Sequence, residues 1–182
     1  MNACVGWGPD QWLGYTEGYK RAGDLLVQHV CDNLRDQDFL IFPIVFSYRQ
    51  AIEVSLKHSI WLGCKLLDKP NSLKLHHRLL DLWKDCRSII EEVWKGEPSD
   101  KLDAIGNILR QFEERDPTST VFRYPVTREG RPSIPSNGRI DIQQFSEIAS
   151  ECFQFLDVCT TALGEYLQSK WEMERAARDN YY

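Results

Sequence analysis

The chain has 182 residues, of which 42% are apolar and 27% charged, and its formal net charge is −5. This length is most simply one domain with a hydrophobic core, and the ordinary composition argues against a disordered or fibrous chain. The acidic balance gives no support to broad, non-specific nucleic-acid binding, although a local basic cleft remains compatible with it.

The N-terminus and the cysteines indicate a cytoplasmic protein. Residues 7–10 read Trp-Gly-Pro-Asp where a signal peptide would have its apolar segment. The six cysteines include no C-x-x-C pair, and most lie among apolar residues, where a free thiol acts as a small hydrophobic side chain. We therefore expect reduced thiols. The apolar segment 39–46 is too short to span a bilayer, so we expect no membrane association.

Apolar periodicity predicts a helical domain over residues 16–170, preceded by an aromatic arm over 1–15 and followed by a polar tail over 171–182. Asp38 and Asp141 are predicted N-terminal caps, because a short acidic side chain can accept the first free backbone N–H groups of a helix. The predicted helices cover residues 16–35, 39–67, 75–95, 99–115 and 142–178.

Two breaks frame the last helices. Gly96 follows the third predicted helix, where glycine commonly ends a helix in a left-handed conformation. Residues 116–139 are rich in Pro, Ser, Thr and Gly, which predicts a long loop with a short hairpin around 122–126 and 133–134. Long loops inside compact domains are uncommon and often functional. The predicted fold class is all-α, an up-down bundle of about five helices with this loop before the last.

A charged stripe runs along the second predicted helix. Arg49, Glu53 and Lys57 are spaced by four residues, which places them on one helical face. Such a run is often a solvated row of ion pairs. This helix is otherwise apolar almost all round, so the stripe must face a partner, a cleft or a loop. If residues 68–74 form a short connection between antiparallel helices, His77 need not lie far from Lys57.

The long loop contains an arginine among aromatic residues, Arg123 beside Tyr124. An arginine in this setting can bind phosphate through two parallel hydrogen bonds. The alternative is structural: Arg123 pairs with Asp116 or Glu53 and pins the loop to the bundle. The predicted ligand-binding residues are Arg49, Lys57, Arg123 and Tyr124.

Three spaced elements resemble the HEPN (higher eukaryote and prokaryote nucleotide-binding) family. Residues 51–57 match an A-x-E-x-x-L-K core on one long helix. Residues 77–82 match an H-x-L-x-x-L element that opens the next helix, and the Arg-Tyr-Pro of 123–125 resembles a third element before the last helix. The resemblance covers about residues 40–167.

This resemblance implies a helical bundle that usually dimerises and works in prokaryotic toxin–antitoxin modules, phage defence or RNA processing. Many HEPN members are ribonucleases that need no metal, while others bind nucleotides or partners. It therefore implies a homodimer with RNA, a nucleotide or a protein of a defence or toxin–antitoxin complex as its partner. We expect no cofactor and no metal, since the sequence lacks a P-loop, H-E-x-x-H and the zinc-deaminase motifs.

The chain departs from the family at the catalytic motif. Catalytic HEPN ribonucleases carry R-x(4–6)-H, in which histidine exchanges a proton and arginine stabilises phosphate charge. Here seven residues separate Arg21 from His29, eight separate Arg49 from His58, and no histidine follows His77. The standard ribonuclease site is therefore missing.

Three functions remain open. The first is an accessory or sensing module that binds RNA, a nucleotide or a protein partner. The second is a metal-independent endoribonuclease with a divergent site. The third is a structural protein whose polar stripe forms a dimer interface. The candidate catalytic residues of the second are Arg49, Glu53, Lys57 and His77.

Overall fold

The computed structural model describes residues 2–6, 11–70, 76–96, 99–134 and 138–179, and confirms an all-α bundle. Within these ranges there is no strand, only an isolated bridge in the long loop. The helices are α1 (Gln11–Asn33), α2 (Gln37–Leu66), α3 (Leu79–Val93), α4 (Ser99–Arg115) and α5 (Ile142–Asp179).

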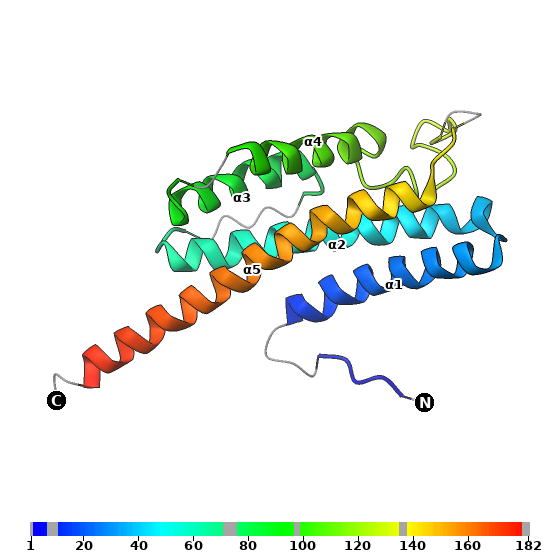
Figure 1. Cartoon of the computed structure of the whole chain (residues 1–182). Coiled ribbons are helices and arrows are strands. Elements are labelled where there is room, and N and C mark those ends of the chain that lie inside the picture. The colour runs from blue at the N-terminus through cyan, green and yellow to red at the C-terminus, as the bar shows by residue number, and fades with distance from the viewer. Residues whose placement is uncertain (1, 7–10, 71–75, 97–98, 135–137, 180–182) are drawn as a thin grey trace.

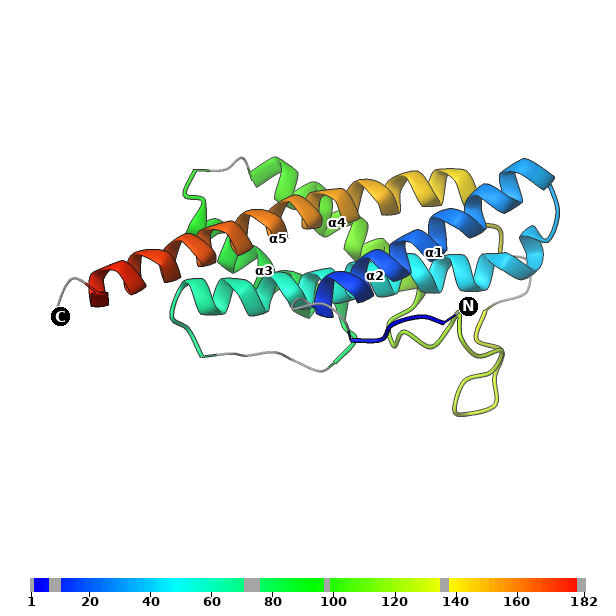
Figure 2. The ribbon, with the colours of Figure 1, turned by 90° about the horizontal axis from the view of Figure 1, so that it is seen from below.

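Helix α2 is the centre of the bundle. It packs against α1, α3 and α5, and Figures 1 and 2 show these neighbours on its different sides. This position explains why the helix is apolar almost all round, since nearly every face meets another helix. By length and composition α2 could cross a membrane, but 56% of its most apolar 18-residue window is buried inside the bundle.

Helix α3 runs parallel to α2. His77 lies beside Glu53, and Ile89 further along α3 lies beside Gly63, so residue numbers rise in the same direction on both helices. Our expectation of a short connection between antiparallel helices was therefore wrong. Leu66 lies about 20 Å along α2 from the level of Glu53, at 1.5 Å per residue, so the end of α2 and His77 are separated by roughly that distance. Elsewhere consecutive helices alternate in direction (Figure 1).

The helix ends differ from prediction at several places. Helix α1 begins at Gln11, so the predicted arm contributes its last residues to a helix. Helix α5 ends at Asp179, one residue beyond its predicted end, so most of the predicted polar tail is helical. The N-cap of α2 is Asp36 rather than Asp38. Asp36 has φ 62° and makes no side-chain cap; its carbonyl oxygen accepts the N–H of Leu40 at 2.8 Å.

The cap of α5 and the hairpin are confirmed, and so is the left-handed conformation of Gly96, but α3 ends at Val93, two residues before its predicted end at residue 95. Gly96 has φ 97°, and Asp141 Oδ1 accepts the N–H of Gln144 at 2.9 Å in the first turn of α5. In the long loop, Val126 pairs with Pro132, and Gly130 turns the chain at φ 75°. The hairpin is thus a single bridge, as the proline content of the segment allows.

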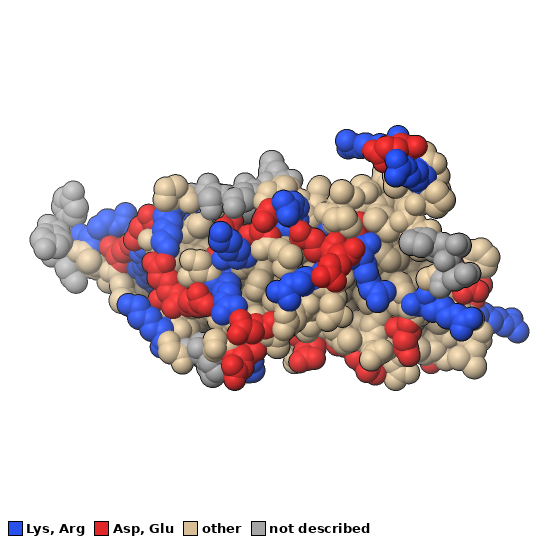
Figure 3. All heavy atoms as spheres, turned by 90° about the horizontal axis from the view of Figure 1, so that it is seen from above, with Lys and Arg blue, Asp and Glu red and all other residues tan. Residues whose placement is uncertain are grey.

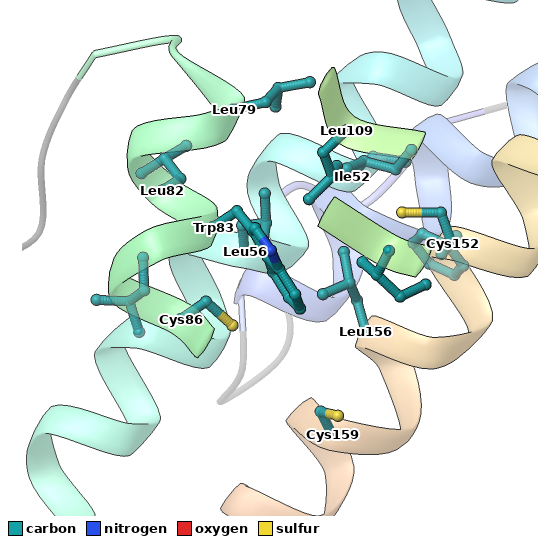
Figure 4. Packing of buried hydrophobic residues seen from close by; sticks show 14 of the residues in the cluster. Ile52, Leu56, Leu79, Leu82, Trp83, Cys86, Leu109, Cys152, Leu156 and Cys159 are labelled. Carbon is teal, nitrogen blue, oxygen red and sulfur yellow. The ribbon is translucent and has the colours of Figure 1, made fainter. Parts of the chain in front are cut away.

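The core lies where α2, α3, α4 and α5 meet. Figure 4 shows Trp83 of α3 among Leu56, Leu109 and Leu156, one from each of the other three helices. The free cysteines Cys64, Cys86, Cys152 and Cys159 are buried, whereas Cys4 and Cys31 are exposed, so Cys31 is not the small hydrophobic core residue that its apolar sequence neighbours predict. Burial raises the pKa of Cys152 to about 12, so this thiol stays protonated and unreactive.

Replacing Gly63 by alanine should lower the free energy of unfolding by about 1–3 kcal/mol, because overpacking displaces neighbours. A Cβ at this position would stand 2.2 Å from Ile89 Cγ2, at the contact of α2 with α3. Gly164→Ala is the matched control, since its Cβ would lie 4.0 Å from a methyl group of Leu62, an ordinary van der Waals distance. Urea unfolding of both variants measures the difference; equal stability would contradict the close helix contact.

Candidate functional site

The charged stripe of α2 converges on the carboxylate of Glu53. Arg49 Nη1 donates to Glu53 Oε2 at 2.9 Å, and Lys57 Nζ donates to Oε1 at 2.8 Å. His77, just before α3, places Nδ1 2.8 Å from the same Oε1. The structure thus brings all four candidate catalytic residues together.

Arg49 is the most deeply buried member of this cluster. Its residue exposure is 0%, and its Nη2 donates to the backbone carbonyl of His77 at 2.8 Å. Its Nε lies 3.6 Å from Asp116 Oδ2, which is an ion-pair distance but too long for a hydrogen bond. Within the described residues Nε–H has no hydrogen-bond acceptor.

Asp116 joins the long loop to the stripe. Its Oδ1 accepts the N–H groups of Thr120 at 2.8 Å and Val121 at 3.0 Å, and only 2% of the residue is exposed. In the sequence, Asp116 was considered only as one of two possible partners of Arg123, and its pairing with Arg49 was not predicted. The available signal was an aspartate opening a Pro-Thr-Ser-Thr segment, where Asp side chains commonly close turns. We call Arg49, Glu53, Lys57, His77 and Asp116 the ionic centre.

The formal charges of the ionic centre balance without His77: two cations, Arg49 and Lys57, face two carboxylates. Burial by itself raises the pKa of Glu53, but the hydrogen bond and positive charge of Lys57, together with the hydrogen bond from His77, outweigh burial and hold this pKa below its usual value. Glu53 is therefore ionised at neutral pH. A pairing of this kind avoids the large penalty of an isolated buried charge.

A third buried carboxylate, that of Glu113, supports the segment that carries His77. Glu113 of α4 accepts the N–H of Leu80 at 2.8 Å, at the start of α3, and Arg78 Nε lies 3.5 Å from it. The sequence analysis missed Glu113, because its position in an amphipathic helix predicts an ordinary exposed glutamate. It fixes the start of α3 and so the position of His77.

Arg123 and Tyr124 lie apart from the ionic centre. The Arg123 guanidinium stands 5.7 Å from the ring centroids of both Phe46 and Tyr124, and Nε donates to the carbonyl of Ser119. In the described structure Arg123 is ion-paired with neither Asp116 nor Glu53, so the predicted pinning by this arginine is wrong. Both Arg123 and Tyr124 are exposed.

The accessible part of the ionic centre is its histidine end. The His77 side chain is 50% exposed and that of Lys57 11%, whereas Glu53 is 1% exposed. An ionised carboxylate can only accept hydrogen bonds, so His77 Nδ1 carries the proton that is donated to Glu53. The other ring nitrogen of a neutral His77, Nε2, then has the free lone pair. An oriented histidine beside a lysine can exchange a proton or contact a phosphate. The described residues contain no group of three His, Cys, Asp or Glu side chains placed to hold a metal.

Comparison with known proteins finds no family model, no curated protein and no solved structure that matches the chain. The likeness to HEPN proteins therefore rests on the three spaced sequence elements alone.

Proposed function

We propose that this chain is a HEPN-like accessory or sensing module of a prokaryotic defence or toxin–antitoxin system, working in the cytoplasm as a homodimer and binding RNA. The observation that carries the proposal is the half-exposed His77 ring held on the buried, ionised Glu53 with Lys57 beside it. A buried ion network is often no more stabilising than apolar packing, so stability alone does not explain it.

The surface favours a local binding site over a long basic track. Figure 3 shows acidic and basic side chains interspersed over the face seen from above, without a large area of one sign. RNA would then be held at two small sites. The first is formed by His77 and Lys57. The second is the exposed pair Arg123 and Tyr124, which offers a guanidinium group and an aromatic ring on which a base can stack. Exposed apolar side chains on α5, including Val158 and Trp171, support a dimer.

The test is the affinity for a short, fluorescently labelled single-stranded RNA at low salt, measured by anisotropy. His77→Ala and Arg123→Ala should each weaken binding about tenfold, corresponding to ~1.4 kcal/mol for a lost phosphate contact. His29→Ala is the matched control, because His29 is 49% exposed and also lies beside a carboxylate, 3.5 Å from Asp36 Oδ2, but on α1. No RNA binding, or equal binding by all variants, contradicts the proposal; binding to a protein of a neighbouring gene instead would point to a protein partner.

A second candidate function, a metal-independent endoribonuclease with a divergent site, is favoured by one detail. The Glu53–His77 hydrogen bond fixes the imidazole as it is fixed in many general bases, with a buried carboxylate on one nitrogen. The same RNA incubated with a chelator separates the two functions. Intact RNA supports a binding module, whereas cleavage that His77→Ala abolishes and His29→Ala preserves supports the enzyme.

A further inference from the structure

A cavity of about 300 Å³ lies on the side of the ionic centre that faces the long loop. Helices α2, α4 and α5 and the loop surround it, and its apolar wall includes Ile108, Phe112, Phe122 and Phe145. His77 and Lys57 do not line it, so the cavity is distinct from the RNA site proposed above. Of the five residues of the ionic centre, Arg49 and Asp116 also line the cavity.

Three arginines line this cavity: Arg49, Arg115 and Arg139. Arg49 is wholly buried, and its Nε–H has no hydrogen-bond acceptor among the described residues. A buried guanidinium N–H without an acceptor is unfavourable, and a ligand oxygen in the cavity would supply the missing acceptor.

The other two arginines stand at the mouth of the cavity. Arg115 ends α4 and Arg139 lies just before α5; both are exposed, and the described structure shows no ion pair for either. The two carboxylates of the cavity are engaged elsewhere: Asp116 accepts two loop amides and faces Arg49, and Asp141 caps α5. Three arginines and two carboxylates leave the lining of the cavity with a net positive charge.

We infer that this cavity binds a small organic phosphate, with the phosphate oxygens held by Arg49, Arg115 and Arg139 and an apolar or planar body against the aromatic wall. Guanidinium groups match phosphate oxygens through paired hydrogen bonds, and three arginines offer more donors than the two oxygens of a carboxylate can accept. The apolar wall favours a ligand with a hydrocarbon or ring portion over free phosphate. A second cavity, of about 640 Å³, shares Arg115, Phe122 and Arg139 and gives such a body room to extend.

Phenyl phosphate is a suitable probe, with inorganic phosphate and phenol as the separate head and body. By titration calorimetry, phenyl phosphate should bind at least about tenfold more tightly than either part alone. The double variant Arg115→Ala/Arg139→Ala should lose that binding. The matched control, Arg21→Ala/Arg175→Ala, removes two equally exposed arginines from α1 and α5 that do not line the cavity, and should bind normally.

A second readout reports on Arg49 without changing it. In ¹⁵N-labelled protein, the Nε–H resonance of Arg49 should shift as phenyl phosphate saturates the site. Failure of phenyl phosphate to bind at millimolar concentration overturns the inference, and so does binding that the Arg115/Arg139 variant retains. Tighter binding of inorganic phosphate than of phenyl phosphate would contradict the inference that the aromatic wall contacts an apolar part of the ligand. None of these results depends on RNA binding at His77, so the two proposals fail or stand separately.

Discussion

Glu53→Gln should lower the free energy of unfolding by about 3–5 kcal/mol, the range found when one partner of a buried ion pair is removed. Glutamine keeps the shape of the side chain but removes the charge that Arg49 and Lys57 share. Arg49 Nη1 and Lys57 Nζ lie 2.9 and 2.8 Å from the carboxylate oxygens, in a site where Glu53 is 1% exposed. The variant therefore leaves two cations facing Asp116 alone.

The same substitution should change how stability depends on pH. Because the folded-state pKa of Glu53 is held below its usual value, the unfolded chain takes up this proton first as pH falls. The contribution of Glu53 is fully present above the unfolded glutamate pKa of about 4.3 and is lost as pH falls through the folded pKa. The stability difference between the wild type and Glu53→Gln should therefore be constant near neutrality and shrink below about pH 4.

Urea unfolding at several pH values, followed by circular dichroism, measures both effects. Glu17→Gln is the control, because Glu17 is exposed on α1. This substitution removes the same charge at a position outside the ionic centre. Its effect should stay within about 0.5 kcal/mol, as for most surface substitutions. A Glu53→Gln protein as stable as the wild type would mean that the carboxylate is not the hub of a buried network.

The helices of this protein were predictable because their apolar residues recur with helical period, and α5 ends within one residue of its predicted limit. The four-residue spacing of Arg49, Glu53 and Lys57 also predicted a shared face that meets something other than water. The direction of α3 was not predictable. The connection after α2 is long enough, at about 3.3 Å per extended residue, to allow either orientation.

The partners of the site were harder to predict than its members. When a helix is covered on all sides, its sequence does not indicate which neighbour contacts its charged stripe. Whether the stripe is met by Asp116, by Arg123 or by a ligand therefore could not be predicted. In the structure Asp116 forms an ion pair with Arg49, while the guanidinium group of Arg123 lies 5.7 Å from the ring centroid of Phe46. Pairing across the chain depends on tertiary geometry, which local spacing does not contain.

Asp116→Ala should destabilise the protein by about 3 kcal/mol and loosen the loop locally. Two backbone hydrogen bonds to a carboxylate are lost, from Thr120 and Val121, and hydrogen bonds to charged groups are worth about 1.5–3 kcal/mol each. Hydrogen exchange measures the local effect. The protection factors of these two amides should fall at least about tenfold, because each kcal/mol lost from the local opening free energy speeds exchange several-fold. Asp32→Ala, an exposed change on α1, should leave their protection unaltered.

The link between loop and helix is a separate question, which a double-mutant cycle with Arg49→Met answers. If the ion pair at 3.6 Å carries part of the anchoring, the two substitutions should be non-additive by about 0.5–3 kcal/mol, as for residues in direct contact. Additive losses would mean that Asp116 organises its own turn without α2. The loop would then be free to move away from Arg49, and the cavity between them could not hold a ligand in a fixed geometry.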